Sequence, residues 1–256
     1  MRGGSRLELL APAGIPAVKP GDDLVAVIAG ALNAEGLILQ SGDVLVVAQK
    51  IVSKAEGRIV DLASITPSAR AQEIARETGK DPRVVELILS ESVRVVRTRR
   101  DLIIVEHRLG LVMANAGVDQ SNVTADDAEQ ALLLPLDPDG SARALRSALS
   151  RRYACDVAVI INDSVGRAWR RGTVGTAIGC AGLPSLADLR GRPDMFGRPL
   201  RTSMVGLADE IAASASLLMG QADESRPVVI VRGLDVNGAD LPAAALVRPQ
   251  EEDLFR

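Results

Sequence analysis

The sequence predicts a mixed α/β (α+β) fold, and two observations carry this prediction. Short apolar runs of strand length are interspersed with longer amphipathic stretches along the 256 residues. The two familiar nucleotide loops are missing, because neither Gly-x4-Gly-Lys-Ser/Thr nor a three-glycine fingerprint after the first strand occurs. We therefore expect neither a P-loop nor a Rossmann fold. The length fits a single domain over 1–256, built as one body or as two closely packed subdomains.

In the N-terminal half, caps and breakers locate the elements. Either Asp22 or Asp23 can cap a helix over 24–32, Gly79 ends a helix that opens at 66–68, and Asp81 with Pro82 starts the next one, which runs to about 90. Apolar or alternating runs predict the following strands: 7–10, 44–47, 92–97, 102–106 and 111–113.

In the C-terminal half, helices are expected over 141–152 and 202–219, and strands over 156–161 and 226–232. The small residues of 177–182 permit close backbone approach. The turn-rich stretch 183–199 either covers a site or only connects elements, and the tail from 241 carries few packing residues.

Composition excludes several classes of function. Aromatic residues make up 2% of the chain, which argues against stacking platforms for single-stranded nucleic acid. The net charge of −3, with no long basic run, argues against a nucleic-acid partner altogether. No apolar run of membrane-spanning length and no leader segment is found. Cys155 and Cys180 are unclustered, which fits a reducing cytoplasm.

Two strand ends carry acidic residues. The run 110–122 begins as an apolar strand and then presents Asp119 and Asn122, a carboxylate that can bind a hard cation and a neighbouring amide. A plain turn is the alternative, since Gly, Asp, Ser and Asn are turn formers.

The second acidic strand end follows 156–161. Asp163 and Ser164 come directly after the apolar run, and Arg167, Arg170 and Arg171 follow. A carboxylate and a hydroxyl suit a cation, and guanidinium groups suit phosphate. A solvated basic turn is the alternative.

A third polar segment, 49–58, follows the predicted strand 44–47. It contains Lys50 and Lys54, and lysine is a compact positive charge suited to phosphate. The alternative is a solvent-facing turn. His107, the one histidine, is interpreted as an ordinary residue at a strand end.

Taken together in chain order, several motifs resemble one family. They are Gly14-Ile-Pro16, 20–24, 49–58, 114–122, Asp137-Pro-Asp139, 163–172, 177–179 and Asp209-Glu-Ile211. The set resembles the coenzyme F-420-0:γ-glutamyl ligases and covers nearly the whole chain. The matched region is the ligase alone, without the nitroreductase-like domain that follows it in some relatives.

The resemblance implies a GTP-dependent ligase that joins L-glutamate to the deazaflavin F-420-0 and extends a γ-linked tail through an acyl phosphate. It also implies a pair of Mg2+ or Mn2+ ions, a role for K+, and a homodimer with a mixed fold. Phosphoryl transfer needs cations that neutralise charge on the γ-oxygens. Alternatives are a related ligase with another acceptor, a non-catalytic deazaflavin- or nucleotide-binding protein and, more distantly, a metal-dependent phosphatase.

The resemblance also implies residue roles. Asp119 and Asp163 would be catalytic metal ligands beside Ser164, and Lys54 a catalytic residue and GTP contact. Gln221 stands where some relatives have a metal-binding glutamate, and an amide binds a cation more weakly than a carboxylate does. The remaining implied GTP contacts are Ile15, Pro16, Ala17, Val18, Gln49, Asn122, Met219, Gly220, Gln221 and Ala222. The three arginines are assigned to phosphate or substrate anions on physical grounds alone.

Overall fold

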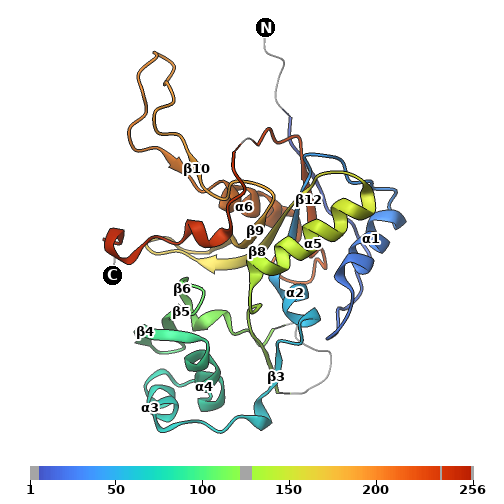
Figure 1. Cartoon of the computed structure of the whole chain (residues 1–256). Helices are drawn as coiled ribbons and strands as arrows, with labels where there is room; N and C mark the ends of the chain where they lie inside the picture. The colour runs from blue at the N-terminus through green and yellow to red at the C-terminus, as the bar shows by residue number, and fades with distance from the viewer. Residues whose placement is uncertain (1–5, 122–128, 237, 255–256) are drawn as a thin grey trace.

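The computed structural model describes residues 6–121, 129–236 and 238–254. Within these residues, the main sheet has the strand order β1-β12-β2-β8-β9 (Figure 1). Strands β2 and β8 are parallel, and all other neighbours in this sheet are antiparallel. The strands are β1 (Glu8–Leu10), β2 (Val44–Ala48), β8 (Ala158–Gly166), β9 (Thr173–Ala181) and β12 (Val228–Arg232).

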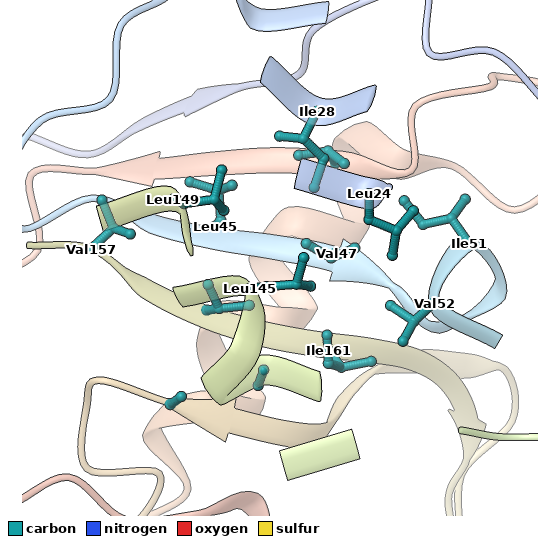
Figure 2. Close-up of a cluster of buried hydrophobic side chains, with 14 of the residues drawn as sticks. Leu24, Ile28, Leu45, Val47, Ile51, Val52, Leu145, Leu149, Val157 and Ile161 are labelled. Atoms are coloured by element: carbon teal, nitrogen blue, oxygen red, sulfur yellow. The ribbon is translucent and has the colours of Figure 1, made fainter. Parts of the chain in front are cut away.

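Helices cover both faces of this sheet. Helices α1 (Leu24–Ala34) and α5 (Pro138–Tyr153) pack on one face, and α6 (Leu207–Met219) packs on the other. Strand β2 shows why: Leu45 and Val47 point to the first face, where Figure 2 shows them among side chains of α1 and α5. Val44 and Val46 join the core beneath α6. A strand buried on both faces reads as a continuous apolar run.

A smaller lobe follows β2. Its helices α3 (Ala69–Thr78) and α4 (Pro82–Ser90) enclose a separate core with the sheet β4-β5-β6. The strands of that sheet are β4 (Ser92–Arg99), β5 (Leu102–His107) and β6 (Val112–Ala114). Strands β3 (Ile59–Asp61) and β7 (Gln130–Leu132) pair antiparallel where the chain leaves and re-enters the main body (Figure 1).

The mixed fold is confirmed, and so are several caps. Asp23, not Asp22, caps α1 by accepting from the amides of Val25 and Ala26. Ser68 and Asp81 cap α3 and α4, and Gly79 ends α3 with a left-handed φ of 75°. These caps are local, so the sequence alone locates them.

Other boundaries differ from the sequence expectation. The segment after β2 is a helix, α2 (Gln49–Ala55), and not a turn. Strand β8 continues to Gly166, because β9 pairs with it along its length. Helix α6 begins at Leu207 and not at 202, because β11 (Met204–Val205) pairs with β10 (Ala187–Asp188). For β8 and α6, pairing with a strand from another part of the chain overrides the local pattern.

Short 3-10 turns complete the fold at Leu62–Ser64, Asn115–Gly117, Ala243–Leu246 and Gln250–Glu252. Among the described residues, no helix has both the length and the apolar character needed to cross a bilayer.

Candidate functional site

Most of the predicted site residues lie where the central strand β2 ends beside β8, and we call this end of the main sheet the sheet edge. Strands β2 and β8 are parallel, with Ala48 opposite Asn162, so the carboxyl end of β2 lies beside the middle of β8. Gln49 therefore begins α2 close to Asp163. The loop before β12 reaches the same edge, where the Ala48 amide donates to the Pro227 carbonyl at 2.8 Å.

Asp119 is held at this edge by an ion pair. The Lys50 Nζ lies 2.7 Å from Asp119 Oδ2, with both side chains about one-third exposed. Ser121 donates from its amide and from its hydroxyl to Asp119 Oδ1, each at 2.7 Å. Burial opposes ionisation, but the Lys50 ammonium and the Ser121 donors outweigh it and lower the pKa of the Asp119 carboxyl. Both oxygens of the Asp119 carboxylate thus have fixed partners.

Asp163 lies within β8 and is half-buried. The Ser164 amide donates to its Oδ1 at 2.8 Å, so this bond uses the backbone of Ser164 and not its hydroxyl. Burial raises the pKa of Asp163 to about 6, and the nearby Asp119 charge adds to this rise while Lys50 opposes it. The two carboxylates therefore share one electrostatic environment, although they come from different parts of the fold.

Helix α2 contributes the polar side chains of Gln49, Lys50, Ser53 and Lys54. Gln49 is buried and accepts from the Ser53 hydroxyl at 2.9 Å, so its orientation is set within the helix. Lys54 is half-buried, and burial followed by the Lys50 charge lowers the pKa of its ammonium. Two lysines on one short helix bring positive charge to this site, and the Lys50 ammonium is paired with Asp119.

The predicted nucleotide segment Ile15–Val18 runs towards α2. Val18 is buried and Ile15 is half-buried in the same core, while Pro16 and Ala17 are exposed. Just beyond it, the Gly21 amide donates to the carbonyl of Ala55 at the end of α2, at 2.9 Å. The segment is thereby fixed beside the helix that carries Lys54.

The segment 219–222 also reaches this edge. Met219 is the last residue of α6, and its sulfur accepts from the Asn162 side-chain amide nitrogen at 3.3 Å. Asn162 directly precedes Asp163 in the chain. Gly220 ends the helix, and Gln221 and Ala222 are exposed. One of the two acids that follow, Glu224, accepts from the Ala222 amide at 2.9 Å, and backbone amides lower the pKa of its carboxyl.

The three arginines are placed differently. Arg167, Arg170 and Arg171 lie in the exposed turn that joins β8 to β9, beyond the pairing of Gly166 with Thr173. Arg167 comes five residues after Asn162, the residue of β8 that pairs with the end of β2. Asn122, the remaining predicted contact, lies outside the described residues.

The chemistry of the site fits a divalent cation that is shared with a phosphate ligand. In residues 6–121, 129–236 and 238–254, no three His, Cys, Asp or Glu side chains gather into a protein-only metal site. Asp119, Asp163 and the Ser164 hydroxyl offer hard oxygen ligands, and Mg2+ is typically held by one or two carboxylates together with substrate phosphates and water. The Lys50 ammonium beside Asp119 shows that this position favours a positive charge.

Sequence reasoning did not assign Lys50 to the site. The signal was present, since two lysines follow a buried strand, but only the fold shows which of them contacts Asp119. The contact joins residues 69 positions apart in the chain, and no local pattern encodes such a pairing.

Comparisons with known proteins identify a family. The family model described as F420-0:Gamma-glutamyl ligase matches residues 14–233. Curated relatives named "Coenzyme F420:L-glutamate ligase" include one from Methanothermobacter thermautotrophicus, 48% identical over 98% of this chain and 99% of the relative.

Two further relatives carry the same name. One is from Methanopyrus kandleri, 49% identical over 93% of each chain, and the other is from Archaeoglobus fulgidus, 44% identical over 98% of this chain and 97% of the relative. With the family model matching most of its length, this chain belongs to the F420-0:γ-glutamyl ligase family.

Proposed function

We propose that this protein is a GTP-dependent ligase that joins L-glutamate to the deazaflavin F-420-0 and extends a γ-linked glutamate tail. The observation that carries the proposal is the convergence of Asp119 and Asp163 around Lys50 at one sheet edge. Relatives that align with nearly the whole chain are named as coenzyme F420:L-glutamate ligases.

The proposed reaction has two steps. A carboxylate oxygen of F-420-0 attacks the γ-phosphorus of GTP, the bond from phosphorus to the GDP oxygen breaks, and an acyl phosphate forms. The glutamate nitrogen then attacks the acyl carbon, the bond from carbon to the phosphate oxygen breaks, and phosphate leaves with loss of one amine proton.

The residues take roles that suit these steps. Asp119, Asp163 and Ser164 would hold Mg2+ or Mn2+ together with phosphate oxygens, with Gln221 as a weaker ligand. The bound ions, and the K+ that the family resemblance implies, supply positive charge against the charge on the γ-phosphoryl oxygens. Lys50 and Lys54 lie on α2, where their ammonium groups can bind phosphate as point charges.

The peripheral residues complete the proposal. Ile15–Val18, Gln49, Asn122 and the segment 219–222 contact the nucleotide. Arg167, Arg170 and Arg171, in the exposed β8–β9 turn, would bind phosphate or substrate anions. We further propose a cytoplasmic homodimer, and light scattering on the purified protein tests its mass.

A ligation assay read by mass spectrometry tests the function. Purified protein is mixed with F-420-0, L-glutamate, Mn2+ and GTP, with ATP in a parallel reaction. Mass increments of one or more glutamyl units with GTP support the proposal and report the tail length. GDP release with unchanged F-420-0 would favour a different acceptor or hydrolysis alone, and no GDP release at all would favour a non-catalytic binding protein. Asp163→Asn is the matched inactive control.

A further inference from the structure

A cavity of about 220 Å3 lies along the outer edge of β9, away from β8. Its walls come from the start of β6, from β9, from the first turn of α6 and from the C-terminal segment. Its polar lining consists of Thr176, Asp209, Arg248 and Asp253, and apolar residues such as Leu111 and Leu246 fill the rest. None of these residues belongs to the site described above.

Asp209 is fixed inside this cavity. It lies in the first turn of α6, is half-buried, and its Oδ1 accepts from the Ala177 amide at 2.9 Å on the free edge of β9. Burial raises the pKa of the Asp209 carboxyl, so the group is more basic than an exposed aspartate. A carboxylate in this position is suited to an ammonium partner.

The C-terminal wall is also fixed. Asp139, near the start of α5, accepts from the amides of Ala243 and Cys180 at 2.8 Å each, and from the Ala244 amide at 3.3 Å. One carboxylate thus ties β9 to the segment that carries Leu246 and Arg248. The cavity is therefore preformed.

The cavity is one strand away from the proposed reaction centre. Thr176 lines it and is the cross-strand partner of Asp163. Directly paired residues on antiparallel strands have Cα atoms about 4.5–5.5 Å apart and side chains on the same face. A small ligand in the cavity can thus present a group to the site that contains Asp163.

We propose that this cavity binds the amino-acid co-substrate, with Asp209 pairing with its ammonium group and Arg248 with a carboxylate. This inference rests on the proposed function and names the subsite of one of its substrates. Drug-sized ligands occupy pockets of about 300–1,000 Å3, so the smaller cavity suits an amino acid better than a nucleotide or a deazaflavin. Two acids in the lining also disfavour a polyphosphate, whereas the ammonium group and one carboxylate of an amino acid can each pair with an opposite charge there.

Steady-state kinetics of Asp209→Asn test the proposal. The amide keeps an oxygen for the Ala177 amide but loses the negative charge, so we expect KM for L-glutamate to rise about tenfold or more. KM values for GTP and for F-420-0 should stay within about twofold. Glu210→Gln is the matched control, because Glu210 is the exposed neighbour on the same turn and its loss should leave all three KM values unchanged.

Arg248→Gln provides a second test that does not depend on Asp209. Arg248 is exposed, so the variant should fold normally and still raise KM for L-glutamate. A wild-type enzyme that ligates glutamate, together with both variants showing an unchanged KM for glutamate, overturns the subsite and leaves the proposed function intact. A shift in KM for F-420-0 alone would assign the cavity to the other substrate. A wild-type protein that forms no product would instead remove the proposed function.

Discussion

The Lys50 Nζ lies 2.7 Å from Asp119 Oδ2 and 3.0 Å from the Ser121 hydroxyl. The same ammonium also opposes the rise in the pKa of Asp163. The Lys50 ammonium thus favours the ionised form of two carboxyl groups, Asp119 and Asp163, which come from separate segments of the chain. It lies where a cation and a phosphate would both be bound in the proposed reaction, and the contact makes Lys50 the first residue to test.

Replacing Lys50 by glutamine should reduce kcat/KM for GTP by about tenfold or more, because two neighbouring carboxylates then lack their nearest cation. Lys50→Arg should retain more activity than Lys50→Gln. The measurement is the GTP-dependent ligation rate at saturating F-420-0 and glutamate. Lys80→Gln, between α3 and α4, is the charge-matched control and should behave like wild type. Equal rates for Lys50→Gln and Lys80→Gln would remove Lys50 from the site.

The raised pKa of the Asp163 carboxyl predicts that the stability of the protein depends on pH. Its folded pKa of about 6 lies above the ordinary value of 3.8, so the folded state prefers the protonated form. The contribution of Asp163 to the free energy of unfolding is therefore fully present below about pH 4 and is lost as the pH rises through about 6. Asp163→Asn should therefore raise the free energy of unfolding at pH 7 by about 1–2 kcal/mol, discounted for partial exposure.

Urea denaturation of wild type and Asp163→Asn, without divalent metal, measures this difference at pH 4.5 and at pH 7. The advantage of the variant should shrink at the lower pH, because the wild-type carboxyl is then protonated. A constant difference between the two proteins at both pH values would mean that Asp163 is ordinarily ionised.

Glu91 shows the opposite behaviour. Burial opposes its ionisation, but His107, Arg58 and Arg108 lower the pKa of its carboxyl to about 2. Arg58 Nη2 lies 2.8 Å and Arg108 Nε 3.0 Å from this carboxylate. This network of Glu91 with Arg58, Arg108 and His107 joins the residue after α4 to Arg58, which directly precedes β3, where the chain enters the smaller lobe.

Glu91→Gln should reduce the free energy of unfolding at pH 7 by about 3–5 kcal/mol, because buried guanidinium charge loses its partner. In the wild type, the contribution of Glu91 is present above about pH 4.5 and is lost as pH falls towards 2. Glu86→Gln is the comparison in the same denaturation experiment, because Glu86 is a half-buried acid of α4 whose polar partner is the uncharged Ser68, and its loss should cost less. Equal losses in the two variants would contradict the role of the network.

Asp139→Ala should loosen the C-terminal segment. The change leaves the amides of Cys180, Ala243 and Ala244 without their acceptor, at a cost of about 2–4 kcal/mol in unfolding free energy. Hydrogen exchange should become faster at 243–247 in particular. Glu251→Ala, an exposed change in the same segment, should leave exchange there as it is in the wild type. Unaltered protection in Asp139→Ala would show that other contacts hold the segment.

The sequence by itself determined the mixed fold class, the helix caps at Ser68, Gly79 and Asp81, and the strands at the centre of the main sheet. Each of these depends on residues close together in the chain, through hydrogen bonds to neighbouring amides or through apolar periodicity. The family resemblance likewise came from local motifs, and the comparisons confirm it. The roles that it implies for individual site residues stay predictions.

Only the tertiary structure decided which polar residues meet. Parallel pairing of β2 with β8 brings Gln49 beside Asp163, and the return of the chain through the smaller lobe brings Asp119 to Lys50. It also extended β8 to Gly166 and joined Asp209, Thr176 and Arg248 around one cavity. Such contacts arise from packing between segments far apart in sequence, where the gain from burial and pairing outweighs local preference.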